Sequence, residues 1–152
     1  MTISEYLKNA KFVQQNLLDE SEKIVLKNED KIIDLNVEQI QSGEGNDGKD
    51  LNNTNDLFTG FYKLSTQLID PKKTAGSRYT FFDTGNFLGN FNTQISNDLT
   101  KVDIFSTGTG AGEKSEFFRG YTNLFGLNPK NERDFNYNIL LPELQKYIKK
   151  YL

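Results

Sequence analysis

Residues 78–92 read Arg-Tyr-Thr-Phe-Phe-Asp-Thr-Gly-Asn-Phe-Leu-Gly-Asn-Phe-Asn, an aromatic run that one polar turn interrupts near the middle of the chain. Charged residues at helical spacing precede this stretch, and two short alternating segments and further helical patterns follow it. The sequence therefore predicts an α+β fold with N-terminal helices, a small antiparallel sheet with a central hairpin, and C-terminal helices.

The polar turn Asp83-Thr84-Gly85 is typical of a helix start. In this interpretation Asp83 or Thr84 accepts hydrogen bonds from the free backbone N–H groups of a short helix that runs through Phe87, Leu88 and Phe91. The three residues then form a structural turn or cap.

The same tripeptide also matches the catalytic Asp-Thr-Gly of small viral aspartic proteases. In those dimeric enzymes two aspartates share one proton and activate water. The apolar pair Phe81-Phe82 precedes Asp83 as this motif requires, and residues 124–128 resemble the apolar-Gly segment that supports such a site. The long helical patterns before residue 42 and the small number of predicted strands argue against this fold, and a three-residue motif is weakly specific.

The composition excludes several kinds of chemistry. The 152 residues suffice for one domain with one core, and His, Cys and Trp are absent. Their absence removes disulfides, thiolate and imidazole catalysis and the usual zinc ligands. The net charge of -3 argues against electrostatic binding of nucleic acid. A hydrophobic fraction of 36%, rich in Phe and Tyr, is compatible with a core that is completed at an interface.

The sequence shows no targeting or membrane signal. No segment approaches the roughly 20 apolar residues of a membrane span, and residues 2–5 do not read as a signal peptide. We therefore expect a chain that works in a cytosol or in a particle assembled there, without contact with a membrane.

The first forty residues are patterned as two helices. Thr2 and Glu5 fit a capping box, and apolar residues at helical spacing predict a first helix from Ile3 to about Leu18. The acidic run 19–22 is either a break or the first turn of a second helix. That second helix ends at Gly43, and its apolar stripe consists of Val25, Ile32, Leu35 and Ile40.

Residues 42–55 consist largely of Gly, Asn and Asp and predict a long solvated loop. The loop and the residue after it carry several carboxylates, but Gly43 occupies the position where a calcium loop needs its first carboxylate. We therefore predict no metal site. The carboxylates considered are Glu44, Asp47, Asp50 and Asp56.

Residues 108–115 nearly match a phosphate-binding P-loop, whose Gly-rich backbone and Lys hold phosphates. Glu113 occupies the position of the Gly that must precede the Lys, and its carboxylate would face the phosphates. No later apolar strand ends in an Asp that could hold magnesium. We predict a mobile loop before a helix, and no cofactor.

The remaining segments complete the predicted architecture. Residues 57–69 are read as a strand or extended arm. Alternating apolar residues on either side of Asn97-Asp98 predict an antiparallel hairpin. A helix is expected over residues 113–124 with Gly126 closing it, another begins at Asn128-Pro129, and helical spacing continues to the end of the chain.

Together these motifs resemble the neck or tail-completion proteins of tailed bacteriophages. In that family an amphipathic N-terminal helix precedes a variable loop, an Asp-Thr-Gly or Thr-Gly turn, a short helix, a hairpin and a C-terminal helical segment. The matching segments are residues 83–88, the hairpin around Asn97-Asp98 and residues 142–152. Residues 35–48 also look like versions from phages of gut Bacteroidetes, whereas residues 108–128 depart from the family pattern.

The resemblance implies a structural virion protein and not an enzyme. It would form a homo-oligomeric ring at the head-tail junction, assembled in the bacterial host cytoplasm. The ring would join a portal or adaptor ring protein to a tail protein and continue the channel for genomic DNA, without sequence-specific binding. An acidic channel repels phosphates and lets DNA slide.

A head-to-tail ring also predicts where contacts lie, because each subunit presents two different surfaces. Subunit contacts are expected on the faces of residues 3–41, and partner contacts on the loops 42–56 and 106–113, which would order only after docking. The candidate subunit-interface residues are Val25, Ile32, Leu35 and Ile40, and the candidate partner-contact residues are Asp47, Gly48, Asp50, Thr109, Gly110 and Gly112.

Overall fold

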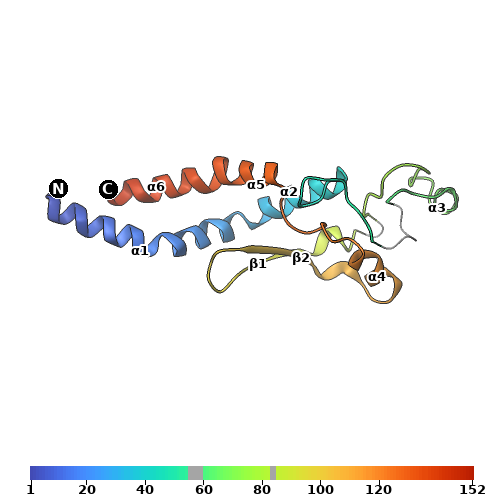
Figure 1. The fold of residues 1–152 in the computed structure, drawn as a ribbon, viewed down its shortest axis with the longest axis horizontal. Helices are drawn as coiled ribbons and strands as arrows, with labels where there is room; N and C mark the ends of the chain where they lie inside the picture. Colours follow the sequence, from blue (N-terminus) through green and yellow to red (C-terminus); the bar gives the residue numbers. More distant parts are fainter. Residues whose placement is uncertain (55–59, 83–84) are drawn as a thin grey trace.

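Two long helical segments lie side by side and form a stalk that carries both chain termini at one end (Figure 1). The computed structural model describes residues 1–54, 60–82 and 85–152. One half of the stalk is helix α1 (Ile3–Lys27), and the other is the continuous run of α5 (Pro129–Phe135), the π-helical turn η3 (Asn136–Leu140) and α6 (Leu141–Tyr151). The predicted α+β fold is confirmed.

Helix α1 begins as predicted but is longer than the sequence indicated. The capping box is present, since the backbone N–H of Thr2 donates to Glu5 Oε2 at 2.6 Å and that of Glu5 donates to Thr2 Oγ1 at 3.2 Å. The prediction of an end near Leu18 is wrong, because no Pro or Gly interrupts the acidic run 19–22 and the helix continues through it. It ends at Asn28, whose side-chain amide donates to the Ile24 carbonyl at 2.8 Å.

The second half of the stalk starts at Asn128, whose side chain accepts from the Asn131 N–H at 2.8 Å, with Pro129 in the first turn as predicted. Pro142 has no N–H to donate into the preceding turn, and that turn is π-helical. The two halves meet where the rings of Phe12 and Tyr151 lie 5.1 Å apart.

Helix α2 (Glu29–Gln41) connects the stalk to a two-stranded antiparallel sheet, β1 (Phe91–Ile95) and β2 (Val102–Ser106). The predicted hairpin is confirmed, with Thr93 opposite Ile104 in the register. A carboxylate at the start of α2 fixes the sheet, because Glu29 Oε1 accepts from the Thr93 hydroxyl at 2.7 Å and from its N–H at 3.2 Å.

Three rings of the aromatic stretch, Phe81, Phe87 and Phe91, lie in the core. The ring of Phe87 stacks on that of Phe118 in helix α4 (Glu113–Arg119) at a centroid distance of 4.1 Å. A short 3₁₀ helix, η1 (Leu88–Asn90), follows Phe87 and leads directly into β1. The short helix expected here is therefore a single 3₁₀ turn. The buried apolar residues of this core are Ile32, Leu35, Ile40, Phe81, Phe87, Phe91, Ile104, Phe118, Tyr121, Leu124 and Phe135.

Helix α4 ends five residues before the predicted Leu124. Its C-cap, Gly120, lies against the side chain of Asn53, and a Cβ at this position would lie 2.0 Å from Asn53 Oδ1. The chain then leaves the helix, and Tyr121 forms a β-bridge with Asn53. A contact with a residue far away in the sequence therefore sets this helix end.

The loop that follows α2 was predicted to be solvated and to become ordered only when a partner binds. The structure differs from this prediction. Residues 42–54 lie against residues 120–126 of the same chain. The Asn46 N–H donates to the Asn123 carbonyl at 2.8 Å, and the Asn46 side chain donates to the Phe125 carbonyl at 2.7 Å. Within the loop, the Leu51 N–H donates to the Gly43 carbonyl at 2.9 Å. The loop is ordered by its own chain.

Hydrogen exchange tests this ordering directly. We expect the amides of Asn46 and Leu51 in the isolated protein to exchange more slowly than the same amides in a peptide of residues 42–54, because both N–H groups are hydrogen-bonded in the folded chain. NMR-detected exchange in D₂O measures both samples. Equal rates in protein and peptide would show that the loop is solvated until a partner binds.

The segment predicted as a strand or arm contains a helix instead. Residues 57–59 fall outside the described residues, and α3 (Leu64–Ile69) is a helix of 6 residues. A short apolar run does not distinguish a strand from a helix by periodicity. Helix α3 lies at the end of the molecule opposite the chain termini (Figure 1).

Candidate assembly surfaces

The first candidate surface is the α3 knob, which we define as residues 61–73. Three of its apolar side chains are largely exposed: Leu64 at 65%, Leu68 at 78% and Ile69 at 86%. No residue of α3 is buried. Single exposed apolar residues are common on protein surfaces, whereas exposed apolar residues that cluster on one element often mark an interaction site.

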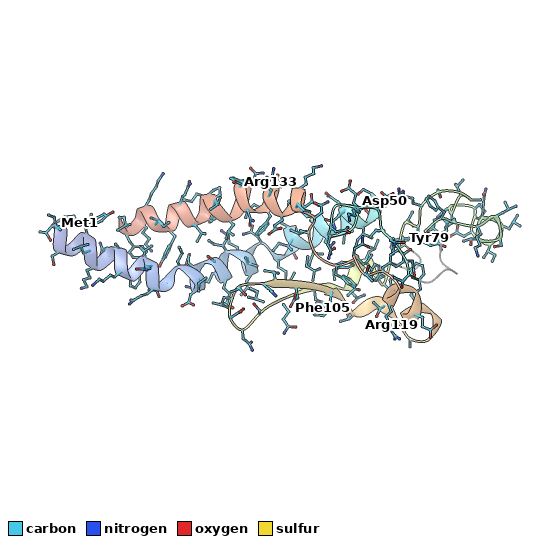
Figure 2. All side chains as sticks on the ribbon, in the orientation of Figure 1. Met1, Asp50, Tyr79, Phe105, Arg119 and Arg133 are labelled. Atoms are coloured by element: carbon cyan, nitrogen blue, oxygen red, sulfur yellow. The ribbon has the colours of Figure 1, made fainter. Side chains whose placement is uncertain are left out.

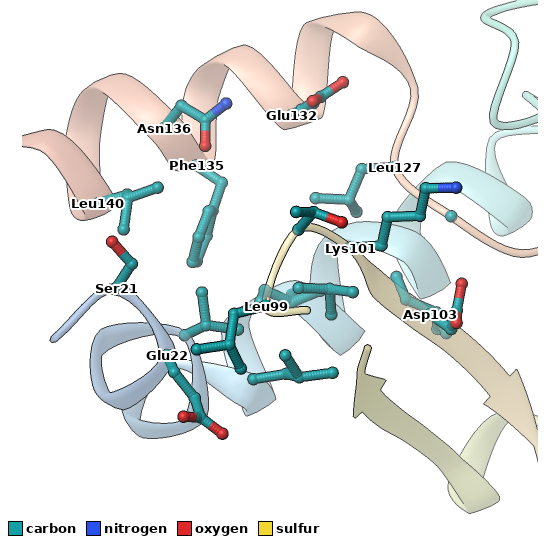
Figure 3. A pocket seen from close by; sticks show the side chains of 17 residues that line it. Ser21, Glu22, Leu99, Lys101, Asp103, Leu127, Glu132, Phe135, Asn136 and Leu140 are labelled. Carbon is teal, nitrogen blue, oxygen red and sulfur yellow. The ribbon is translucent and has the colours of Figure 1, made fainter. Parts of the chain in front are cut away.

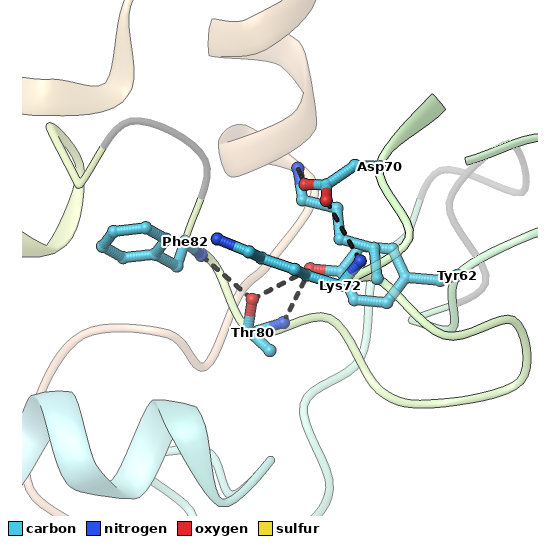
Figure 4. A network of polar contacts seen from close by, with 6 residues as sticks. Tyr62, Asp70, Lys72, Thr80 and Phe82 are labelled. Carbon is cyan, nitrogen blue, oxygen red and sulfur yellow. Dashed lines mark hydrogen bonds and ion pairs between the residues drawn. The ribbon is translucent and has the colours of Figure 1, made fainter. Parts of the chain in front are cut away.

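Polar contacts hold the α3 knob in place (Figure 4). The Tyr62 hydroxyl lies 3.0 Å from Thr80 Oγ1 and accepts from the Thr80 N–H at 3.0 Å. The backbone of Tyr62 also accepts from Gly76 and donates to Ser77, each at 2.9 Å. These hydrogen bonds fix the base of the knob. The fold therefore holds the apolar side chains of Leu68 and Ile69 in exposed positions.

The second candidate surface is the outer side of the stalk. Ile3, Leu7 and Leu18 are 82%, 55% and 56% exposed, and their spacing puts them on one side of α1. Figure 2 shows side chains spreading outward from both stalk helices, with Met1 at the free end. Apolar side chains are therefore exposed at both ends of the molecule.

The third candidate surface is a cavity of about 480 Å³ between the hairpin and the stalk, which we call the stalk cavity (Figure 3). Its apolar walls come from the junction of α1 and α2, the hairpin, and the stalk helices. Leu99, in the hairpin turn, has a φ of 58°, and its side chain lines the cavity. The apolar lining residues are Val25, Ile32, Ile95, Leu99, Val102, Ile104, Leu127, Phe135 and Leu140.

The hairpin turn beside the stalk cavity is stabilised by Asp98. Its Oδ1 accepts from the Ser96 hydroxyl at 2.6 Å and from the Thr100 hydroxyl at 2.7 Å. These hydrogen bonds, from Ser96 first and then from Thr100, lower the pKa of Asp98 below its usual value. The carboxylate is therefore charged at neutral pH, and its hydrogen bonds to Ser96 and Thr100 stabilise the turn that borders the cavity.

The residues predicted as a subunit interface lie inside the chain. Ile32, Leu35 and Ile40 are 3%, 6% and 0% exposed and belong to the core. Val25 is half-buried and lines the stalk cavity. The prediction that this stripe faces another subunit is wrong for the three buried residues, because the hairpin and the segment 124–127 cover it.

The predicted partner-contact residues of the first loop are exposed, but the two carboxylates bind groups of their own chain. Asp47 Oδ1 accepts from Asn123 Nδ2 at 3.0 Å, and Asp50 Oδ2 lies 2.9 Å from Arg78 Nη2. The hydrogen bond from Asn123, and then that from the Lys49 N–H, lowers the pKa of Asp47. Gly48 is exposed and has a φ of 73°.

The second predicted contact loop is a short ordered turn. Residues Thr107–Thr109 form the 3₁₀ helix η2, and Gly108 is buried against the Asn86 carbonyl, where a Cβ would lie 2.1 Å from the oxygen. Thr109 is half-buried, and Gly110 and Gly112 are exposed with positive φ. The stem of Lys114 lies against Gly110, where an added Cβ would be 3.0 Å from its Cδ.

The protease interpretation gains no support from the fold. Asp83 and Thr84 lie outside the described residues, and Gly85 has a φ of 80°. The segment 124–128, compared above with a protease support segment, is hydrogen-bonded to α2. The described ranges contain two regular strands in a largely helical chain. In the same ranges no three Asp, Glu, Cys or His side chains lie close enough together to hold a metal ion.

The sequence missed the α3 knob and the stalk cavity. A local signal for the knob was present, since Leu68-Ile69 directly precedes the turn residues Asp70-Pro71 and turns lie at the protein surface. The cavity has no local signal, because its walls come from three separate parts of the chain.

Within the described ranges no helix is both long and apolar enough to cross a membrane.

Comparison with known proteins gave no match to a family model, to a curated protein or to a solved structure.

Proposed function

We propose that this chain is a structural assembly protein whose copies form a ring at the head-tail junction of a tailed bacteriophage. In this role it joins a portal or adaptor ring to the tail and acts through contacts with other proteins, without catalysis. The resemblance of its motifs to phage neck proteins supplies the biological setting. The physical support comes from its surface.

The observation that carries the proposal is the exposure of apolar side chains at two opposite ends of an elongated chain. The chain exposes 10156 Å², whereas a compact monomer of its mass, 17.4 kDa, exposes about 7,800 Å². The excess is roughly 2,300 Å². A ring subunit that makes two obligate contacts covers about 2,000 Å² or more of its own surface.

Two different apolar surfaces favour a head-to-tail arrangement. In a two-fold dimer the same patch serves both subunits, whereas a ring pairs one patch with another on the next copy. The α3 knob lies at one end of the molecule, whereas the outer side of the stalk and the stalk cavity lie away from it, so the chain offers the knob of the next copy a different surface (Figure 1). The net charge of -3 is suited to a channel through which DNA slides.

Co-sedimentation with the portal protein encoded in the same genome tests the junction role. We expect the purified chain to sediment with assembled portal rings in a fixed ratio, and to do so at both 0.1 M and 0.5 M salt, because apolar contacts are not screened. An unrelated acidic protein of similar size is the control. A chain that stays in the supernatant under both conditions would contradict the proposed position.

A further inference from the structure

We propose that the α3 knob of one copy inserts into the stalk cavity of the next copy, and that this contact closes the ring. It presupposes the ring proposed above and names the two surfaces that meet. The occupant of the cavity is thus a second copy of this chain, through the exposed side chains of Leu68 and Ile69.

The two surfaces match in size and polarity. The knob ends in adjacent aliphatic side chains that are 78% and 86% exposed, at Leu68 and Ile69. The stalk cavity, at about 480 Å³, exceeds the roughly 150 Å³ that accommodates one benzene ring. It therefore has room for more than one aliphatic side chain, and Val25, Leu99 and Phe135 are among the apolar residues of its walls, which also carry charged and polar side chains.

The charges around the two surfaces are complementary. Among the residues that line the stalk cavity, three are acidic and one is basic: Glu22, Asp103, Glu132 and Lys101. The knob has the reverse balance, with three lysines and one aspartate: Lys63, Lys72, Lys73 and Asp70. Asp70 and Lys73 pair with each other within the knob at 3.8 Å, and the Lys72 N–H donates to Asp70 at 3.1 Å, so the excess positive charge of the knob comes from Lys63 and Lys72. Opposite charges around an apolar contact fix its orientation and raise the association rate.

A knob cannot fill the cavity of its own chain. Helix α3 lies at the end of the molecule away from the stalk, whereas the cavity lies between the hairpin and the stalk helices (Figures 1 and 3). The base of the knob is held by backbone bonds at Tyr62 and Tyr79. Insertion must therefore be intermolecular, and each copy can both give a knob and receive one.

Two variants test the contact, one on each surface. Leu68→Asp places a charge on the knob, and Val102→Lys places a positive charge in the cavity wall, facing the lysines of the incoming knob. Both residues are partly or largely exposed, at 78% and 36%, so both variants should fold, which circular dichroism checks. We expect each variant alone to be monomeric by native mass spectrometry at a concentration where the wild type is a ring.

Mixing the two variants gives the sharper result. The cavity of Leu68→Asp and the knob of Val102→Lys are both intact, so one contact per pair can form. We expect a 1:1 heterodimer that grows no further. Leu26→Asp is the matched control, since Leu26 is 52% exposed, does not line the cavity and receives the same substitution; it should keep the wild-type ring.

Four outcomes would overturn the contact. If both variants keep the ring, the ring forms through other surfaces, and the proposed function stands without this contact. If the Leu26→Asp control also dissociates, association is not specific to the knob. If wild-type protein retains a small apolar molecule that Val102→Lys loses, with assembly unchanged, the cavity is a ligand site. A wild type that is monomeric throughout contradicts the contact and the ring together.

Discussion

Phe87→Ala is expected to destabilise the protein by about 3 to 5 kcal/mol, the usual cost of deleting a fully buried aromatic ring. Phe87 is 3% exposed. Its ring stacks on Phe118 at 4.1 Å and also lies within 5.3 Å of Phe91, so it joins the hairpin to α4. The cavity left behind cannot collapse without moving both elements. Urea unfolding monitored by circular dichroism measures the loss.

Phe82→Ala is the matched control, because this ring is 55% exposed and lies five residues away in the same aromatic stretch. Its expected cost is within about 0.5 kcal/mol, as for most surface substitutions. If Phe82→Ala proves as costly as Phe87→Ala, the arrangement of the aromatic core described above is wrong.

Asn36→Leu is expected to destabilise the protein by about 2 to 4 kcal/mol, because it removes the partners of buried backbone groups. Asn36 is fully buried, at 0% exposure. Its amide donates to the carbonyls of Leu124 at 3.3 Å and Gly126 at 3.1 Å, and its Oδ1 accepts from the Gly126 N–H at 3.3 Å. Leucine has a similar size and no polar atoms, so it fills the space and leaves the Leu124 carbonyl and the Gly126 N–H unpaired.

The control for this substitution is Asn138→Leu on the exposed side of the stalk, where the side chain bonds only Asp134 among the described residues. We expect little change in stability there. Unchanged stability of Asn36→Leu in the same urea titration would mean that the bonds between α2 and the segment 124–126 contribute nothing net to folding.

Features that depend on neighbouring residues were predictable from the sequence. The capping box at Thr2 and Glu5, the Asn128-Pro129 helix start and the hairpin of residues 91–106 each have a local signal: a cap residue, a proline in the first turn, or alternation around a polar turn. The structure confirms all three.

Features that depend on distant residues were not predictable. The loop 42–54 has the composition of a solvated segment, and its order comes from contacts with residues more than 60 positions away, such as Asn123 and Gly120. The stripe that includes Ile32, Leu35 and Ile40 has the same spacing whether it faces its own hairpin or another subunit. The position of the hairpin decides whether the stripe is buried within the chain or faces another subunit. In this structure the hairpin packs on the stripe and buries it.

The central claim is that the exposed apolar surfaces of this chain are covered by other copies of itself. Native mass spectrometry of the purified chain, over a range of concentrations and without any partner, tests it most directly. We expect one closed oligomer of fixed copy number that increases with concentration at the expense of monomer. A chain that stays monomeric at every concentration would contradict the account, and a stable dimer would direct attention to Asp83 as a catalyst.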